Sequence, residues 1–175
     1  MEKKQFFTLI ACISTAFSIN ASQICKNNIA ATTPDNDFTV HDQGVVTHHV
    51  TGLMWMRCSL GQELDGNTCK DDASHFNWQN ALKTADGFSF AGFNDWRLPN
   101  KNELESIVEE RCHSPAINSS IFPFPSSTYL DWYWSSSPYS SEPGNAWGVH
   151  FGPGSVYQDI VNAGGRVRLV RSIDN

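Results

Sequence analysis

Residues 92–112 read GFNDWRLPNKNELESIVEERC and carry the strongest local signals in the chain. Asn100 is a good N-cap residue, and Glu103 stands three positions later, as in a capping box. Pro99 disfavours a helical conformation at Leu98, so the helix should begin only after the proline. The segment therefore predicts an extended strand, a sharp corner and a capped helix.

The second half of this stretch has one apolar face. The residues on that face recur at helical spacing: Leu104, Ile107, Val108 and Cys112. We expect the helix to run as far as Cys112, where a disulfide could fasten its end. Trp96, Arg97, Asn100, Glu103 and Arg168 are interpreted as structural. Each of the two arginines could satisfy buried carbonyl groups or pair with Asp95 or Glu103.

The rest of the chain contains one more helix and several strands. Asn77 can cap a helix that ends at Gly87, with Trp78, Ala81, Leu82 and Ala85 on its apolar face. Short strands are predicted on both sides of the helices, at 38–40, 45–49, 53–57, 133–137, 146–151, 155–160 and 166–171. Strands that are segregated from helices indicate an α+β fold with an antiparallel sheet.

Composition limits the possible partners. The chain has 175 residues, of which only 17% are charged and 12% are aromatic. Without residues 1–21 it would hold 10 Lys and Arg against 17 Asp and Glu, a net charge of −7. This acidic balance argues against nucleic acid and against a strongly anionic partner.

The N-terminus is typical of a signal peptide. Lys3 and Lys4 precede an apolar run, and Ala21 offers a small residue for cleavage. That run is shorter than the roughly 20 residues that span a bilayer, so we expect no transmembrane segment. Lipidation at Cys12 is an alternative to plain secretion. Residues 1–21 are thus predicted to be a signal peptide, 22–37 an N-terminal arm and 38–175 a single exported domain.

Four cysteines remain after this segment, at positions 25, 58, 69 and 112. An even number in an exported chain predicts two disulfides, for which three pairings exist. Cys58 and Cys69 flank a short loop and form the easiest bridge, which leaves Cys25 for Cys112. No pair has metal-binding spacing, and no metal or other cofactor is predicted.

One combination of motifs resembles a known family. It comprises TGLMW at 51–55, NDWRLP at 94–99 followed by Glu103-Leu104, YWSSS at 133–137, and RLVR at 168–171. Over about residues 38–172 the chain resembles the Lcl C-terminal domain, a bacterial family of unknown function. The resemblance implies a C-type-lectin-like fold, related to formylglycine-generating enzymes, with two helices on a twisted antiparallel sheet. Some members form the tails of surface adhesins, for which binding to glycans or host polymers has been proposed.

The candidate binding residues lie in the loops after the corner. Trp132, Tyr133 and Tyr139 could form an aromatic surface that stacks on sugars. Glu142 and Asn145 are similar to part of the Glu-Pro-Asn motif of C-type lectins, although the glycine at position 144 breaks its spacing. No motif or residue pair predicts catalysis.

We therefore expect an exported, non-enzymatic binding or adhesion module, working in the periplasm, at the cell surface or outside the cell. Its partner would be a glycan or a protein of the envelope or surface. The alternatives are a structural envelope component that makes only protein contacts and a divergent enzyme of the formylglycine-generating fold.

Overall fold

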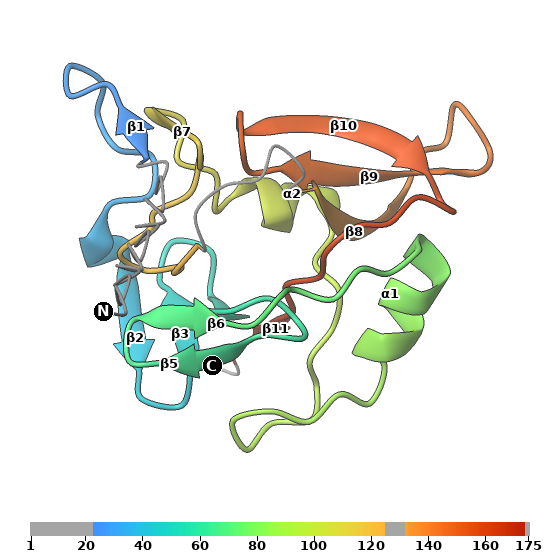
Figure 1. Cartoon of the computed structure of the whole chain (residues 1–175), viewed down its shortest axis with the longest axis horizontal. Coiled ribbons are helices and arrows are strands. Elements are labelled where there is room, and N and C mark those ends of the chain that lie inside the picture. The colour runs from blue at the N-terminus through green and yellow to red at the C-terminus, as the bar shows by residue number, and fades with distance from the viewer. Residues whose placement is uncertain (1–22, 125–131, 174–175) are drawn as a thin grey trace, which may run out of the picture.

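A computed structural model describes residues 23–124 and 132–173 of the chain (Figure 1). The predicted signal peptide, with Cys12, lies outside these residues. The described elements, in chain order, are β1 (Ile24–Cys25), η1 (Asp35–Asp37), β2 (Phe38–His41), β3 (Val45–His48), β4 (Leu53–Met56), β5 (Glu63–Asp65), β6 (Thr68–Lys70), α1 (Trp78–Ala85), α2 (Lys101–Glu105), β7 (Cys112–His113), β8 (Trp132–Pro138), β9 (Asn145–His150), β10 (Ser155–Ile160) and β11 (Val170–Ser172).

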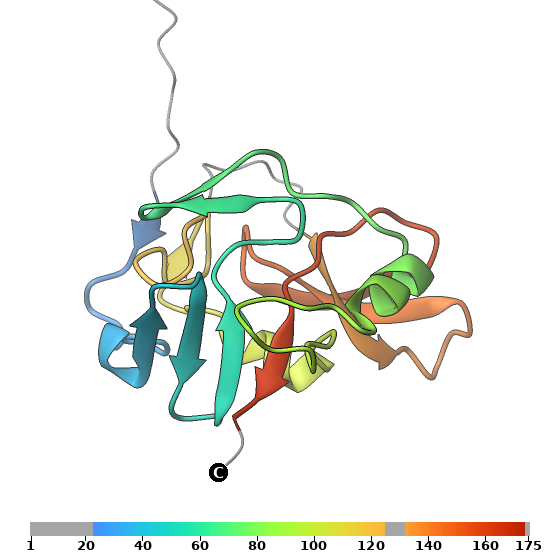
Figure 2. The ribbon, with the colours of Figure 1, turned by 90° about the horizontal axis from the view of Figure 1, so that it is seen from below.

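Two antiparallel sheets form the body of the fold. The larger has the order β11-β4-β3-β2, and its strands lie side by side in Figure 2. The smaller has the order β10-β9-β8 (Figure 1). Every residue of β3 and β4 is buried, as the nearly unbroken apolar run at 53–56 requires. The α+β prediction is confirmed, but the antiparallel strands divide into separate sheets.

Helix α1 begins and ends where the sequence predicts. The Asn77 side chain accepts a hydrogen bond from the Asn80 N–H, at 2.9 Å. Ala81 and Ala85 are buried, and the indole of Trp78 donates a hydrogen bond to the Ser135 carbonyl of β8, at 2.8 Å. Both helices contact β8, and α2 also contacts β9. The helices therefore pack mainly against the smaller sheet.

Helix α2 is much shorter than predicted. Its capping box is present, but the helix ends at Glu105, and Cys112 lies on β7. Ile107, Val108 and Glu109 are all buried, and three consecutive buried residues do not fit the single apolar face of a helix. The Glu109 N–H instead donates to the Ala116 carbonyl, at 3.1 Å. Contacts from distant segments thus replace the helical hydrogen bonds.

Ion pairs hold the corner before α2. The Arg97 guanidinium binds Glu103 through two hydrogen bonds of 2.7 Å, one to each carboxylate oxygen. Asp95 binds the buried Arg171 of β11, at 2.7 Å. The buried Trp96 lies between them in sequence and donates to the Phe90 carbonyl. The structural roles of Trp96, Arg97, Asn100 and Glu103 stay a prediction.

The guanidinium of Arg168 is almost completely buried. It donates hydrogen bonds to the carbonyls of Met56 and Arg57, and it lies 5.2 Å from the ring centroid of Phe122. Burial lowers the pKa of Arg168. This arginine therefore binds backbone carbonyls inside the core.

Both predicted disulfides are present, Cys25–Cys112 and Cys58–Cys69. The first joins β1 to β7, which pair as a two-stranded sheet. The second closes a loop that contains a hairpin of β5 and β6, where the sequence predicts only a loop.

A buried carboxylate also holds the N-terminal arm. Glu109 accepts hydrogen bonds from the N–H groups of Thr32 and Thr33, at 3.2 and 3.0 Å, and from the Thr33 hydroxyl, at 2.8 Å. The arm is therefore fastened at more points than Cys25, the anchor that the sequence predicts.

Candidate functional site

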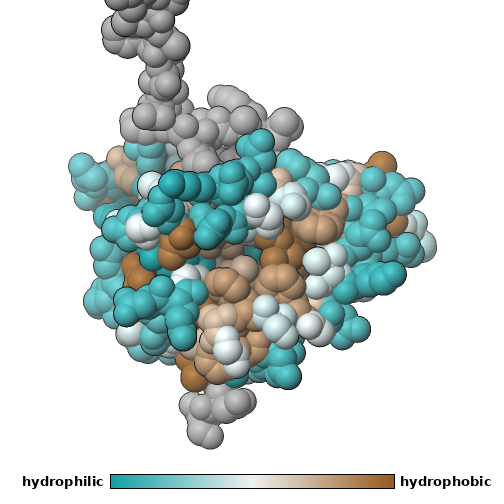
Figure 3. All heavy atoms as spheres, turned by 60° about the horizontal axis from the view of Figure 1, so that its bottom comes forward, coloured by the Kyte–Doolittle hydropathy of each residue, from teal (hydrophilic) through white to brown (hydrophobic). Residues whose placement is uncertain are grey.

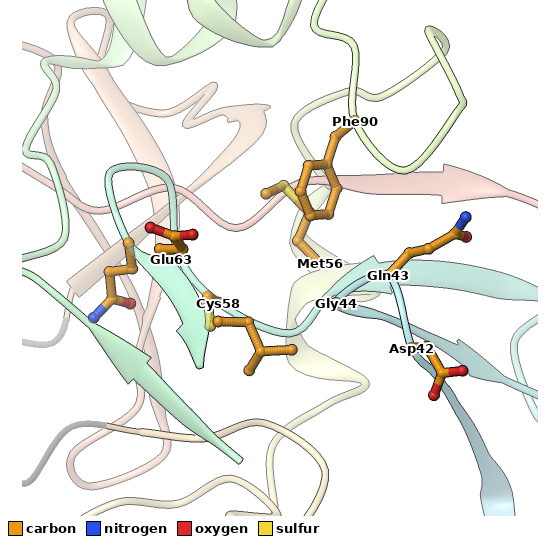
Figure 4. Close-up of a pocket in the computed structure, with 9 residues that line it drawn as sticks. Asp42, Gln43, Gly44, Met56, Cys58, Glu63 and Phe90 are labelled. Atoms are coloured by element: carbon orange, nitrogen blue, oxygen red, sulfur yellow. The ribbon is translucent and has the colours of Figure 1, made fainter. Parts of the chain in front are cut away.

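A pocket among the described residues has a volume of about 320 Å³ (Figure 4). It lies where the β2–β3 turn, the end of β4, the start of the β5 hairpin and the aromatic loop 88–93 meet. Its lining consists of Asp42, Gln43, Gly44, Met56, Cys58, Gln62, Glu63, Leu64 and Phe90. Four separate segments of the chain build one hollow.

Gly44 forms the floor of the pocket. It ends the three-residue loop between β2 and β3, with a φ of 78°, as is usual for the last residue of such a loop. A β-carbon at this position would lie 3.4 Å from Cζ of Phe90 and 3.5 Å from Cδ2 of Leu64. Glycine therefore suits this position for two reasons. It adopts the positive φ that the turn needs, and it leaves open the space between Phe90 and Leu64.

Phe90 forms one wall, and its position is well determined. The backbone of Phe90 pairs with that of Phe93 through two hydrogen bonds, and its carbonyl accepts one from the Trp96 indole at 2.9 Å. The rings of Phe90 and Trp96 meet edge to face, with centroids 6.1 Å apart. The buried Trp96 therefore holds this loop through its indole N–H and its ring.

The β5 hairpin forms the opposite wall. The Cys58–Cys69 disulfide ties the hairpin to the end of β4. The Gln62 amide accepts a hydrogen bond from the Ser59 N–H, at 3.2 Å, and donates one to the Asp71 carbonyl, at 3.1 Å. These contacts fix the chain on both sides of Glu63 and Leu64.

Three polar side chains stand at the rim of the pocket. Figure 4 shows Asp42 and Gln43 on one side of Phe90 and Met56, and Glu63 on the other. Within residues 23–124 and 132–173, no side-chain hydrogen bond or ion pair engages Asp42, Gln43 or Glu63. No lysine or arginine lines the pocket. The site combines an apolar base with unengaged acceptors, so it can hold an uncharged or cationic group and disfavours an anion.

The aromatic residues that the sequence predicts as a binding surface lie elsewhere, and two of them are buried. Trp132 is 6% exposed and Tyr133 is 1% exposed. The Tyr133 hydroxyl shares a 2.6 Å hydrogen bond with the Ser59 hydroxyl. The expectation of an aromatic surface on these two residues is therefore wrong.

The reason is visible in the neighbouring strands. The Trp132 ring crosses Gly148 of β9, where any side chain would collide with the indole, and meets the ring of Tyr157 of β10 at 4.5 Å. Tyr157 itself is 42% exposed. A glycine between larger residues of a strand often marks a close approach by another group. Gly148 was therefore the sequence feature from which the burial of a neighbouring ring could have been predicted.

The other predicted binding residues are accessible. Tyr139 is half-buried, with its ring against Trp147 at 5.0 Å. The Asn145 amide donates hydrogen bonds to Glu142 and Gln158, at 2.8 and 2.7 Å. The amide and the Glu142 carboxylate are thus bound to each other. A binding role for Tyr139, Glu142 and Asn145 stays a prediction.

Three other observations on the described residues bear on function. A second hollow, of about 310 Å³, is lined by residues that include Trp96 and Arg97, but the Arg97 guanidinium is already bound to Glu103. Among residues 23–124 and 132–173, no group of three or more His, Cys, Asp or Glu side chains could hold a metal ion. In the same residues, no helix has the length and apolar character needed to cross a membrane.

Comparison with known proteins gives one match. Residues 44–171 match the family described as the Lcl C-terminal domain. No curated protein sequence matches the chain. The matched range starts at the end of the β2–β3 turn and ends in β11, so it includes the pocket lining from Gly44 to Phe90 but not Asp42 and Gln43.

Proposed function

The chain belongs to the Lcl C-terminal domain family, and from this premise we propose that it is an exported, non-enzymatic module that binds carbohydrate. The pocket between Phe90 and the β5 hairpin is the observation that carries this proposal. Adhesion to a glycan of the envelope or of another surface would be its biological use.

The chemistry of the pocket fits a sugar. Sugar rings present apolar C–H faces together with hydroxyl groups. Apolar contact area inside the pocket comes from Met56, Leu64 and Phe90. Hydrogen-bonding groups at the rim come from Asp42, Gln43 and Glu63. Because the rim side chains make no side-chain hydrogen bonds or ion pairs within the described residues, a ligand would not have to displace such bonds.

The charge of the pocket narrows the class of glycan. Two carboxylates and no cation line it, so a sulfated or otherwise anionic polymer would be repelled at this site. The acidic balance of the whole chain, with a net charge of −6, points the same way. The expected ligands are neutral or positively charged sugars.

Other observations support export and a role without catalysis. Two disulfides suit an oxidising compartment. They also engage every cysteine of residues 23–124 and 132–173, so thiol chemistry of the kind expected for a formylglycine-type enzyme has no free thiol there. Two helices, antiparallel sheets and two disulfides are features that a C-type-lectin-like fold would have, and we propose that fold for the domain.

The test is carbohydrate binding by the purified protein and by Phe90→Ala. We expect selected oligosaccharides on a glycan array to bind, and Phe90→Ala to weaken them about tenfold, the equivalent of about 1.4 kcal/mol. Phe88→Ala is the matched control, since Phe88 belongs to the same loop but does not line the pocket. Absence of binding to every glycan, or equal loss in both variants, would reject the proposal.

A second candidate is a structural role through protein contacts alone. Figure 3 shows apolar side chains gathered on one face of the molecule, within a hydrophilic surround. Exposed apolar patches of this kind are common in protein interfaces. Purification with one partner at fixed stoichiometry, without glycan binding, would select this function over the first.

A further inference from the structure

The two carboxylates of the pocket differ from several others in the described part of the chain because they are not paired with a cation there. Elsewhere, Asp95 binds Arg171, Glu103 binds Arg97, Glu105 binds Lys101 and Asp65 binds Lys70. Asp42 and Glu63 have no such counter-ion among the described residues.

The hairpin itself explains why Glu63 is free. Glu63 and Lys70 are direct cross-strand partners in the β5–β6 register, a position where opposite charges usually pair. The Lys70 ammonium instead binds Asp65, at the turn end of the same hairpin. The lysine opposite Glu63 is therefore paired with a carboxylate that does not line the pocket.

We infer that the pocket selects a sugar that carries a free, protonated amino group. This inference rests on the proposed carbohydrate-binding function and specifies its ligand class. The ammonium of a hexosamine would be attracted by Asp42 and Glu63, while Met56, Leu64 and Phe90 contact the carbon skeleton of the sugar. Apolar walls beside charges of one sign strengthen their field in a cleft, because they exclude water from the path of the field.

The experiment compares two oligosaccharides that differ only at the amino group. One is a β-1,4-linked glucosamine oligomer and the other is its fully N-acetylated form, in which the amine is an uncharged amide. Titration calorimetry is run at a mildly acidic pH, at which the sugar amine is protonated. We expect the wild type to bind the free amine about tenfold more tightly, and high salt to remove most of this difference.

Three variants locate the effect. Glu63→Gln should reduce the preference about threefold, and Asp42→Asn with Glu63→Gln should abolish it. Asp65→Asn should also reduce it, because Lys70 then becomes available to Glu63, although Asp65 does not line the pocket. Glu110→Gln is the matched control, as Glu110 is exposed and outside the lining, and it should leave the preference unchanged.

The outcomes separate this inference from the proposed function. Equal binding of both oligomers, with both weakened by Phe90→Ala, overturns the amine preference but leaves carbohydrate binding in place. A preference that persists in the double variant also overturns the inference, since the ammonium would then lie elsewhere. If neither oligomer nor any other glycan binds, the proposed function fails and this inference fails with it. Thermal unfolding of each variant shows that it is folded.

Discussion

Glu109 and Glu63 show two opposite uses of a glutamate in one domain. Glu109 is 2% exposed, and its carboxylate accepts hydrogen bonds from the backbone of the N-terminal arm. Glu63 is exposed at the pocket rim and accepts none from the described protein. A buried carboxylate must be fully hydrogen-bonded to be tolerated, whereas a free one in a pocket remains available to a ligand. The two regions should therefore respond differently to substitution.

The largest loss of stability is expected on the side of the arm, from its disulfide. Cys25 and Cys112 are 87 positions apart, against 11 for Cys58 and Cys69. Because a longer closed loop restricts the unfolded chain more, Cys25→Ser with Cys112→Ser should cost about 4 kcal/mol of unfolding free energy, and the pair at 58 and 69 about 3 kcal/mol. Denaturation in guanidinium chloride under non-reducing conditions measures both, and the reverse order would contradict the expectation.

Glu109→Ala should follow, with a loss of about 3 kcal/mol. The substitution leaves the buried N–H and hydroxyl of Thr33 without their acceptor, and it also removes the acceptor of the exposed Thr32 N–H. Glu110→Ala is the control, since its side chain is exposed, and it should stay within about 0.5 kcal/mol of the wild type. Urea unfolding at neutral pH compares the two, and similar losses would show that Glu109 does not anchor the arm.

A smaller effect is expected from acid. Burial alone would raise the pKa of Glu109, but hydrogen bonds from Thr33, Thr32 and Arg111 bring the pKa below its usual value. The stabilisation is therefore complete above the pKa of an unfolded glutamate, about 4.3, and is lost as the pH falls through the lower pKa of the folded state. Unfolding midpoints measured through this range should fall more steeply for the wild type than for Glu109→Gln. If the midpoints of the two proteins fall equally with pH, the acid sensitivity belongs to other groups. Asp95 and Glu103 are candidates, because their pKa values are also lowered.

The smallest effect on stability is expected at the pocket rim. Asp42→Asn and Glu63→Gln remove charges that have no partner in the described structure, so each should change the unfolding free energy by less than about 0.5 kcal/mol. The same substitutions should still alter ligand binding. A loss above about 1 kcal/mol in either variant would mean that the rim serves the fold, and the contrast with Glu109 would disappear.

Much of the local structure was predictable because it depends on neighbouring residues. Asn77 and Asn100 cap their helices within three residues, and the short Cys58–Cys69 bridge follows from its small loop. The end of α2 was not predictable in this way. Val108 and Glu109 leave the helix because Ala116 and Ile117, further along the chain, supply their backbone partners.

The site was less predictable than the fold. Trp132 and Tyr133 were expected at the surface because turn-forming residues surround them, but neighbouring strands and the segment at 166 cover them. The sequence did not predict a binding role for Phe90, because an aromatic residue in a loop does not show which segment will lie opposite it in the fold. Its partner in the pocket, Leu64, belongs to a hairpin that the sequence did not predict.

The sequence by itself determined the α+β class, the helix starts, the two disulfide pairs and the family of this protein. Those features rest on capping within one turn, the small number of cysteines and a recurrent set of motifs. Only the tertiary structure decided where Cys112 lies, which aromatic rings are buried and that a pocket exists. These depend on segments that lie far apart in the chain and meet only after folding, as Gly44, Glu63 and Phe90 do at the pocket.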